Sequence, residues 1–204
     1  RRMSYRVAVR ALCEFTAKMG DLDLRFTPSP SAQEGIAGHR TVASRRSVRY
    51  QPELSLEGQY LNLTVRGRAD GYDPDSHVLE EVKTYRGDLS AMPANHRQLH
   101  WAQARIYGWL LCNQMQLAQL NLALVYFDIA HEQETRIEQT WTATDLQQFF
   151  EQQCALFLAW AEQEITHRHA RDEAARNLTF PHAAFRTGQR VLAEAVYKTA
   201  RTGR

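Results

Sequence analysis

Hydrophobic and polar residues follow two different periods along this chain, and the change of period separates expected helices from expected strands. Apolar side chains recur every three to four residues over 4–19, and Gly20 ends that pattern. The same spacing predicts four later helices, at 31–46, 93–114, 142–175 and 190–199. β-formers in alternation predict five strands, at 50–56, 61–72, 78–84, 117–129 and 135–140.

The order of these elements predicts an α/β fold, with a mixed central β-sheet flanked by helices. Gly58 and the run Asp73-Pro74-Asp75-Ser76 are expected in the connections between the first three strands, which would form a meander. Residues 122–127 are apolar throughout, as in a strand that is buried on both faces.

The character of the chain changes after Arg176. Before it, Phe149, Leu156 and Trp160 are expected to face the core from the long helix. After it come an extended stretch and a short helix. We therefore expect one domain over 1–176 and the start of another over 177–204.

The composition is 44% hydrophobic and 24% charged, as in a folded soluble domain. No apolar run is long enough to span a membrane, and the first ten residues lack the apolar region of a secretory signal. Three scattered cysteines indicate reduced thiols in a cytoplasm rather than a disulfide framework. They also cannot supply the four thiolates of an ordinary iron–sulfur cluster.

Charge is unevenly distributed, although the net charge is only +2. Residues 1–50 carry ten Lys and Arg against four Asp and Glu, whereas the remainder carries fifteen against nineteen. A basic first quarter suits an anionic partner such as nucleic acid. On charge alone, a solvated basic face is an equally good interpretation.

Two short pieces of sequence place carboxylates and a lysine near a predicted turn. Asp70 lies near the end of one expected strand, and Glu81 and Lys83 lie on the next, where alternation puts both on one face. If the two strands pair as an antiparallel hairpin, Asp70 lies beside Glu81. Glu80 competes with Glu81, but it is out of phase with Lys83, so Glu81 is preferred.

Such a cluster is suited to phosphodiester hydrolysis. Two carboxylates can hold Mg²⁺ or Mn²⁺, which polarises a phosphodiester and lowers the pKa of a bound water. A lysine can orient that water or stabilise charge in the transition state. An Asp near a turn and a Glu-x-Lys on a strand also arise by chance, and then they are ordinary solvated charges.

Four motifs follow one another on the expected elements: Gly35-Ile36-Ala37-Gly38-His39, Gly67-Arg68-Ala69-Asp70-Gly71, Glu81-Val82-Lys83 and Gln103-Ala104-Arg105-Ile106-Tyr107. In this order they resemble the PD-(D/E)XK nuclease superfamily, and within it the RecB-like branch. The resemblance covers about residues 5–130 and implies a restriction-endonuclease-like core. Ala69 stands where the superfamily name has proline, a difference that concerns backbone geometry rather than chemistry.

The resemblance implies a role for several of these residues. Asp70 and Glu81 would be the central metal ligands, helped by the backbone carbonyl of Val82, and His39 would be an additional ligand. Lys83 would be the catalytic lysine. A surface histidine is the alternative for His39, for which Mn²⁺ would be a better partner than Mg²⁺.

Further residues fit a DNA-binding surface around that site. By the same resemblance, Gln103 and Tyr107 would touch DNA or brace the site, and their spacing of four puts them on one helix face. Tyr107 has a second interpretation as a core residue. Arg68 and Arg86 are basic neighbours that could contact phosphates.

The end of the chain carries a second resemblance. Phe180, Pro181, Arg186 and Gln189 are spaced as F-P-x-x-x-x-R-x-x-Q. This resembles the segment before the ATP-binding loop in DinG/XPD-type superfamily 2 helicases, which implies that Gln189 reads adenine in a full-length helicase. No G-x-x-x-x-G-K-[ST] loop is present in the 204 residues, so this chain alone is not expected to hydrolyse ATP.

Three functions are therefore in contention. The first is a metal-dependent deoxyribonuclease joined to a helicase and acting in DNA repair or processing. The second is a catalytically inactive DNA-binding or loading module of a helicase, and the third is a ribonuclease of the same fold. Carboxylates beside phosphate would repel DNA unless a metal compensates, which favours a nuclease over a pure binder.

Overall fold

A computed structural model describes residues 4–20, 30–179 and 182–203 of the chain. They fall into two units, Arg1–Ala161 and Glu162–Arg204. In chain order the elements are β1 (Tyr5–Ala8), α1 (Val9–Thr16), α2 (Ala32–Ser44), β2 (Gln51–Tyr60), β3 (Leu63–Asp73), β4 (Val78–Tyr85), the 3₁₀ turn η2 (Leu89–Ala91), α3 (Ala94–Met115), β5 (Gln119–Asp128), β6 (Gln133–Thr142), α4 (Ala143–Arg176) and α5 (Gln189–Thr202).

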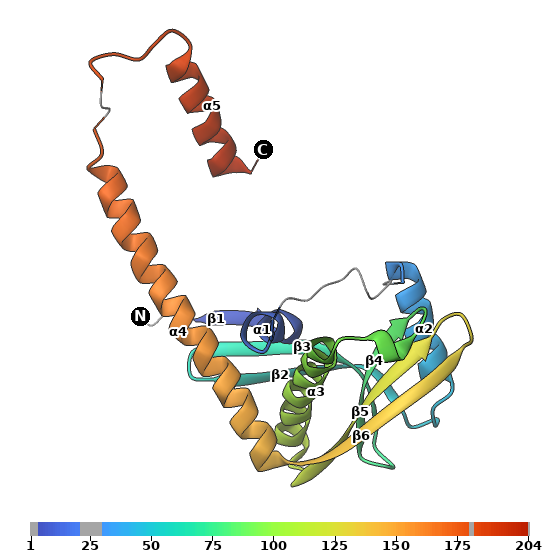
Figure 1. Cartoon of the computed structure of the whole chain (residues 1–204). Coiled ribbons are helices and arrows are strands. Elements are labelled where there is room, and N and C mark those ends of the chain that lie inside the picture. The colour runs from blue at the N-terminus through green and yellow to red at the C-terminus, as the bar shows by residue number, and fades with distance from the viewer. Residues whose placement is uncertain (1–3, 21–29, 180–181, 204) are drawn as a thin grey trace. The chain divides into compact units, whose positions relative to one another are not determined.

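The strands of the first unit form one mixed sheet, as the sequence predicts (Figure 1). β2, β3 and β4 are the expected antiparallel meander. β5 then pairs parallel with β4, and β6 pairs antiparallel with β5. The parallel β4–β5 pair requires a crossover, which α3 supplies. The expectation of an α/β fold with a mixed sheet flanked by helices is confirmed.

Two strands share one edge of β3. β2 occupies the other edge along nearly the whole of β3, from Leu63 to Tyr72. β1 pairs in parallel with Leu63–Arg66, and β4 pairs with Gly71–Asp73. Between these two pairings, residues 67–70 of β3 face no strand of the described chain on that edge. The gap falls on the Gly-x-x-Asp motif.

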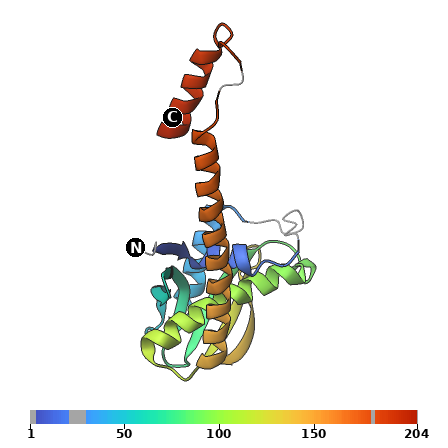
Figure 2. The same ribbon diagram turned by 90° about the vertical axis from the view of Figure 1, so that its left-hand side faces the viewer.

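Helices cover both faces of the sheet, and each face has its own core. On one face Val42 of α2 packs with side chains of β4 and β5, namely Val78, Val82, Ala123, Val125 and Phe127. On the other face α1, α3 and the first half of α4 pack on a larger core that includes Leu79, Leu122, Leu124 and Tyr126. Figure 2 shows α3 crossing in front of the strands on this side. Alternation along β4 therefore directs Val82 toward α2, and Leu79 toward α3.

The prediction of a helix over 4–19 is wrong for its N-terminal part. Residues 5–8 form strand β1, and the helix is limited to Val9–Thr16. Val7 fits a strand as well as a helix, and pairing with Val65 on β3 decides between them. The pattern of residues 4–19 alone cannot reveal a partner strand so far along the chain.

Two further expectations are corrected by packing. Gly58 lies inside β2 rather than in a connection, paired with Val65, and a Cβ there would lie 2.4 Å from Leu110 Cδ2. This glycine therefore makes room for α3. In α4, Leu156 and Trp160 are exposed, and the core instead takes the row Leu146, Phe150, Cys154, Leu158 and Ala161.

The second unit comprises the end of α4 and the helix α5. No residue of α5 is buried, and the apolar side chains of Val191, Leu192, Val196 and Tyr197 are exposed. In the described part of the chain, no helix is both long enough and apolar enough to cross a membrane. The three cysteines are free and buried.

The packing of α2 on the sheet gives a test with a matched control. Gly38→Ala is expected to cost about 1–3 kcal/mol of unfolding free energy, because its methyl would lie 2.5 Å from Thr84 Cγ2 and 3.1 Å from Phe127 Cδ1. Gly35→Ala meets only Thr84 Oγ1 at 3.7 Å, so helix propensity should stabilise it by up to about 1 kcal/mol. Urea denaturation measures both. Equal effects would contradict the close contact at Gly38.

Candidate functional site

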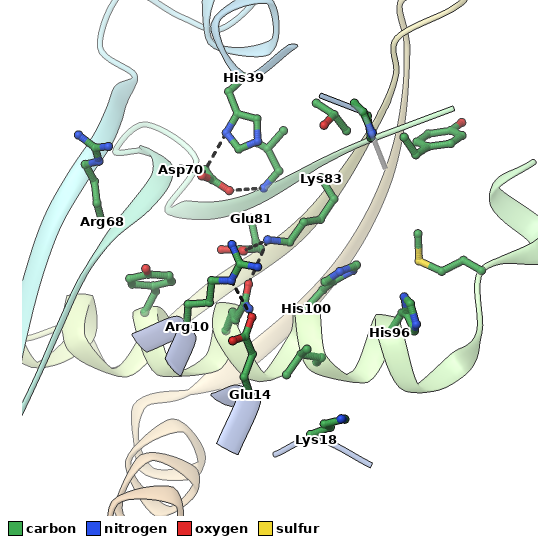
Figure 3. Close-up of a pocket in the computed structure, with 18 residues that line it drawn as sticks. Arg10, Glu14, Lys18, His39, Arg68, Asp70, Glu81, Lys83, His96 and His100 are labelled. Atoms are coloured by element: carbon green, nitrogen blue, oxygen red, sulfur yellow. Dashed lines mark hydrogen bonds and ion pairs between the residues drawn. The ribbon is translucent and has the colours of Figure 1, made fainter. Parts of the chain in front are cut away.

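A pocket of about 810 Å³ opens beside the gap in β3. Its walls come from α1, α2, β3, β4 and α3 (Figure 3). Seven of the residues singled out from the sequence line it: His39, Arg68, Asp70, Glu81, Lys83, Gln103 and Tyr107. The four sequence motifs thus contribute to one cavity, although they are spread over about 70 residues of chain.

Lys83 is held between a carboxylate and an amide. Its Nζ lies 2.6 Å from Glu81 Oε1 and donates to Gln103 Oε1 at 3.0 Å. Glu81 is almost completely buried, and burial raises its pKa to about 7 against the opposing charge of Lys83. Burial also disfavours the charge on Lys83, but Glu81 and Asp70 outweigh it, so the pKa of Lys83 is raised. Gln103 therefore orients the lysine from the neighbouring helix.

Asp70 joins β3 to both α2 and β4. Its Oδ2 accepts a hydrogen bond of 2.7 Å from the backbone amide of Val82, and its Oδ1 lies 3.2 Å from His39 Nδ1. The hydrogen bond with Asp70 raises the pKa of His39, although burial opposes it. Both carboxylates and both basic groups thus face the same pocket.

Tyr107 and Gly67 fit together at the gap. The ring of Tyr107 is buried, and its hydroxyl hydrogen-bonds the backbone of Arg68. A Cβ on Gly67 would lie 2.5 Å from Tyr107 Oη, so only glycine admits the ring this close. Tyr107 is therefore buried, as its interpretation as a core residue predicts, and it also lines the pocket.

Two neighbouring glutamates on β4 have different surroundings. Glu80 points to the α2 side, where it accepts hydrogen bonds from Arg46 at 3.0 Å and from Tyr50 Oη at 2.8 Å and pairs with Arg136. A Cβ on Gly71 would lie 1.9 Å from Tyr50 Oη, so this glycine makes room for the tyrosine. Glu80 is the centre of a structural ion cluster and does not line the pocket.

The remaining sequence candidates lie in different places. Arg68 is at the rim of the pocket, with a 63% exposed side chain whose guanidinium is 3.6 Å from Glu53. Arg86 does not line the pocket and instead pairs with Glu34, which belongs to the capping box of α2. Gln189 begins α5 in the second unit, where its Oε1 accepts from the Arg186 amide at 3.0 Å. Phe180 and Pro181 lie outside the described residues.

Sequence reasoning missed several lining residues. They are Arg10, Glu14 and Lys18 from α1 and its following turn, and His96 and His100 from α3. The two histidines repeat the helical spacing that leads to Gln103 and Tyr107, so that face of α3 carried a usable signal. The α1 residues had no such signal, because the placement of α1 depends on β1.

The pocket contains side chains that can act as metal ligands, but they contact one another. Among residues 4–20, 30–179 and 182–203, no three His, Cys, Asp or Glu side chains are grouped so as to hold one. Asp70 and Glu81 are engaged instead with His39, the Val82 amide and Lys83. The chemistry still fits a hard divalent cation, because two carboxylates share one pocket and burial leaves Glu81 with a raised pKa.

Comparisons with known proteins add little at the level of sequence. No protein-family model matches the chain, and no curated protein matches it. The solved structure of the protein SSO0001 is similar with a TM-score of 0.47 and 19% identity, covering 76% of this chain and 78% of that one. A phage-related exonuclease from Haemophilus somnus 129PT is similar with a TM-score of 0.48 and 13% identity, covering 78% and 82%.

The contact of Gly67 with Tyr107 is testable by a double-mutant cycle. Gly67→Ala is expected to destabilise the fold by about 1–3 kcal/mol, because Tyr107 must shift. Tyr107→Phe should cost about 1 kcal/mol for the lost hydrogen bond. Since the shortest clash involves the hydroxyl, the double variant should be more stable than the sum of the two losses by at least about 0.5 kcal/mol. Additive losses in urea denaturation would mean that the two residues do not touch.

Proposed function

We propose that this chain is a metal-dependent nuclease that hydrolyses the phosphodiester bonds of DNA. The observation that carries the proposal is the convergence of Asp70, Glu81 and Lys83 with His39 in one pocket. Carboxylates arranged in this way repel a phosphodiester unless a cation compensates, whereas a cation and a lysine together favour one. The resemblance of the four motifs to RecB-like nucleases points in the same direction.

The proposed metal ligands are Asp70 and Glu81 with the carbonyl of Val82, and His39 is a further ligand. Mg²⁺ suits the oxygen donors, and His39 makes Mn²⁺ an equally good partner. When bound, the cation would polarise the scissile phosphodiester and promote ionisation of a water. Binding would displace Lys83 from Glu81 in part, since both compete for the same carboxylate.

Each remaining residue has a role that follows from its contacts. Gln103 holds the ammonium of Lys83 toward the pocket, where that charge stabilises a phosphate that gains negative charge. Tyr107 fixes the backbone at Arg68. The exposed guanidinium of Arg68 at the rim can contact a neighbouring phosphate of the strand.

A second candidate is a DNA-binding module without catalytic activity. The ion pair of Lys83 with Glu81 favours it, because this pair already neutralises the buried carboxylate without a metal. The two candidates differ in cleavage and not in binding, so a single assay separates them.

The deciding experiment compares two adjacent glutamates. Labelled single-stranded DNA, double-stranded DNA and RNA are incubated with the wild-type chain in Mg²⁺, Mn²⁺ or EDTA. Glu81→Gln is expected to reduce metal-dependent cleavage about 100-fold or more, with a smaller loss of stability than Glu80→Gln, because Lys83 keeps Gln103 as an acceptor and the charge of Asp70 nearby. Glu80→Gln is expected to cost about 3 kcal/mol of stability, because Arg46 and Arg136 lose their buried partner. It should retain most of the activity below its melting range.

The outcomes separate the candidates. Cleavage of DNA that requires a metal and is lost only in Glu81→Gln supports the nuclease. Binding of DNA without cleavage in every condition supports the inactive module. Preferential cleavage of RNA would contradict the proposed substrate, and equal loss of activity in the two variants would contradict the assignment of Glu81.

We further propose that residues 177–204 lead into a helicase motor that acts with the nuclease on DNA during repair. The spacing of Arg186 and Gln189 and the exposed apolar residues of α5 support this. The coding sequence after Arg204 should then specify a phosphate-binding loop of the form G-x-x-x-x-G-K-[ST]. A stop codon there, or a continuation without such a loop, would contradict the proposed motor.

A further inference from the structure

We propose that His100 is a further substrate-binding residue, which donates a hydrogen bond from Nε2 to a non-bridging phosphate oxygen of the bound strand. His100 is not part of any motif discussed above. The inference rests on the proposed function and extends it, because it adds a contact on the side of the pocket away from α2. It follows from the position of the ring and from the direction of its hydrogen bonds.

The position of His100 suits a contact with substrate. The residue lies on α3 one turn before Gln103, and it lines the same pocket as Lys83 and Glu81. Figure 3 shows His39 and His100 on different sides of the Glu81–Lys83 pair. Lys83 and His100 are therefore open to the same cavity, so one bound strand can contact both.

The tautomer of His100 is set by a buried tyrosine. Its Nδ1 lies 3.0 Å from the hydroxyl of Tyr126, a side chain that is fully buried on β5. Tyr126 also takes a hydrogen bond from Arg97, which can only donate. The buried Tyr126 proton still needs an acceptor, and Nδ1 of His100 lies within hydrogen-bond distance of the hydroxyl, so we assign Nδ1 as the acceptor. The proton of the imidazole accordingly resides on Nε2.

The ring is also held neutral. Burial lowers the pKa of His100 to about 3, and the nearby charges of Lys83, His96 and Arg97 lower it further. A neutral ring with its proton on Nε2 is neither a general base nor a useful acid near neutral pH. The ring can therefore act only as a fixed N–H donor near the ammonium of Lys83. An anionic oxygen is an acceptor that can bind the N–H group and the ammonium together.

The choice of a phosphate oxygen over a base edge follows from the neighbouring charges. Arg10 and Lys18 line the same pocket as His100, with Arg10 paired to Glu14 at 2.7 Å, and Lys83 is close enough to affect the pKa of His100. These cations attract phosphate regardless of base identity. Binding through His100 should therefore be independent of sequence.

The test uses variants that remove or preserve the donor. His100→Leu removes it, whereas His100→Gln retains an N–H near the position of Nε2. Tyr126→Phe removes the group that orients the ring. Tyr72→Phe is a matched control, because the buried Tyr72 makes the same 3.0 Å contact with His77 Nδ1 away from the pocket. Fluorescence anisotropy in Ca²⁺, a cation that also binds carboxylate oxygens, measures binding to oligo-dT and oligo-dA, and cleavage in Mg²⁺ or Mn²⁺ gives KM and kcat.

His100→Leu is expected to raise the Kd in Ca²⁺ and the KM about tenfold for both oligonucleotides, as for loss of one hydrogen bond to a charged group. His100→Gln should recover binding to within about threefold of the wild type, Tyr126→Phe should fall between the two, and Tyr72→Phe should bind normally. Unchanged binding in His100→Leu, no recovery in His100→Gln, or a loss confined to one base would each overturn the inference.

A measurement on the wild-type chain is independent of variant folding. The ¹⁵N spectrum of the imidazole of His100 should show a protonated Nε2 and an unprotonated Nδ1 from pH 5 to 8, and Tyr126→Phe should disturb that pattern. A proton on Nδ1, or titration in that range, would overturn the inference. If the wild type cleaves DNA and His100→Leu binds and cleaves it equally well, only this inference is refuted. If the wild type neither binds nor cleaves DNA, the proposed function is refuted as well.

Discussion

The site depends on an interruption in the pairing of one strand. β1 and β4 share an edge of β3, and among the described residues no strand pairs with 67–70 on that edge. Unpaired backbone groups are costly unless other partners are found. Side chains provide partners here: the hydroxyl of Tyr107 bonds the backbone of Arg68 on β3, and the carboxylate of Asp70 accepts from the Val82 amide on the neighbouring strand β4. The same groups that complete the sheet therefore form the wall of the pocket.

Opposite faces of β4 carry two glutamates, one in an ion cluster and one in the pocket. Glu80 faces α2 and is fully neutralised by Arg46, Arg136 and Tyr50, so it serves as a rigid ionic anchor. Glu81 faces α3, shares a single lysine with Asp70, and keeps a raised pKa. Burial of a carboxylate with only one neighbouring cation accounts for that raised pKa. Glu81 therefore has one cation close to its carboxylate, whereas Glu80 next to it has two.

Much of this arrangement could be predicted from local patterns. Period-two alternation is sufficient to put Glu81 and Lys83 on one face, and spacing of four is sufficient to align Gln103 with Tyr107. Non-local contacts were not predictable: β1 needs β3 as a partner, and Gly58 is explained by Leu110 rather than by a turn. The pairing of Arg86 with Glu34 also joins residues far apart in the sequence, and no local pattern predicts it. The orientation of His100 likewise depends on Tyr126, which lies on another element.

The two glycines of β3 have a consequence for the assembly of the sheet. Gly67 admits the ring of Tyr107 and Gly71 admits that of Tyr50, so two phenol rings press on the strand four residues apart. A shift of β3 by one residue would bring side chains such as Arg68 or Tyr72 against those rings, and neither would fit. The glycine pair therefore favours one register of β3 over its neighbours, and that register decides where Asp70 points.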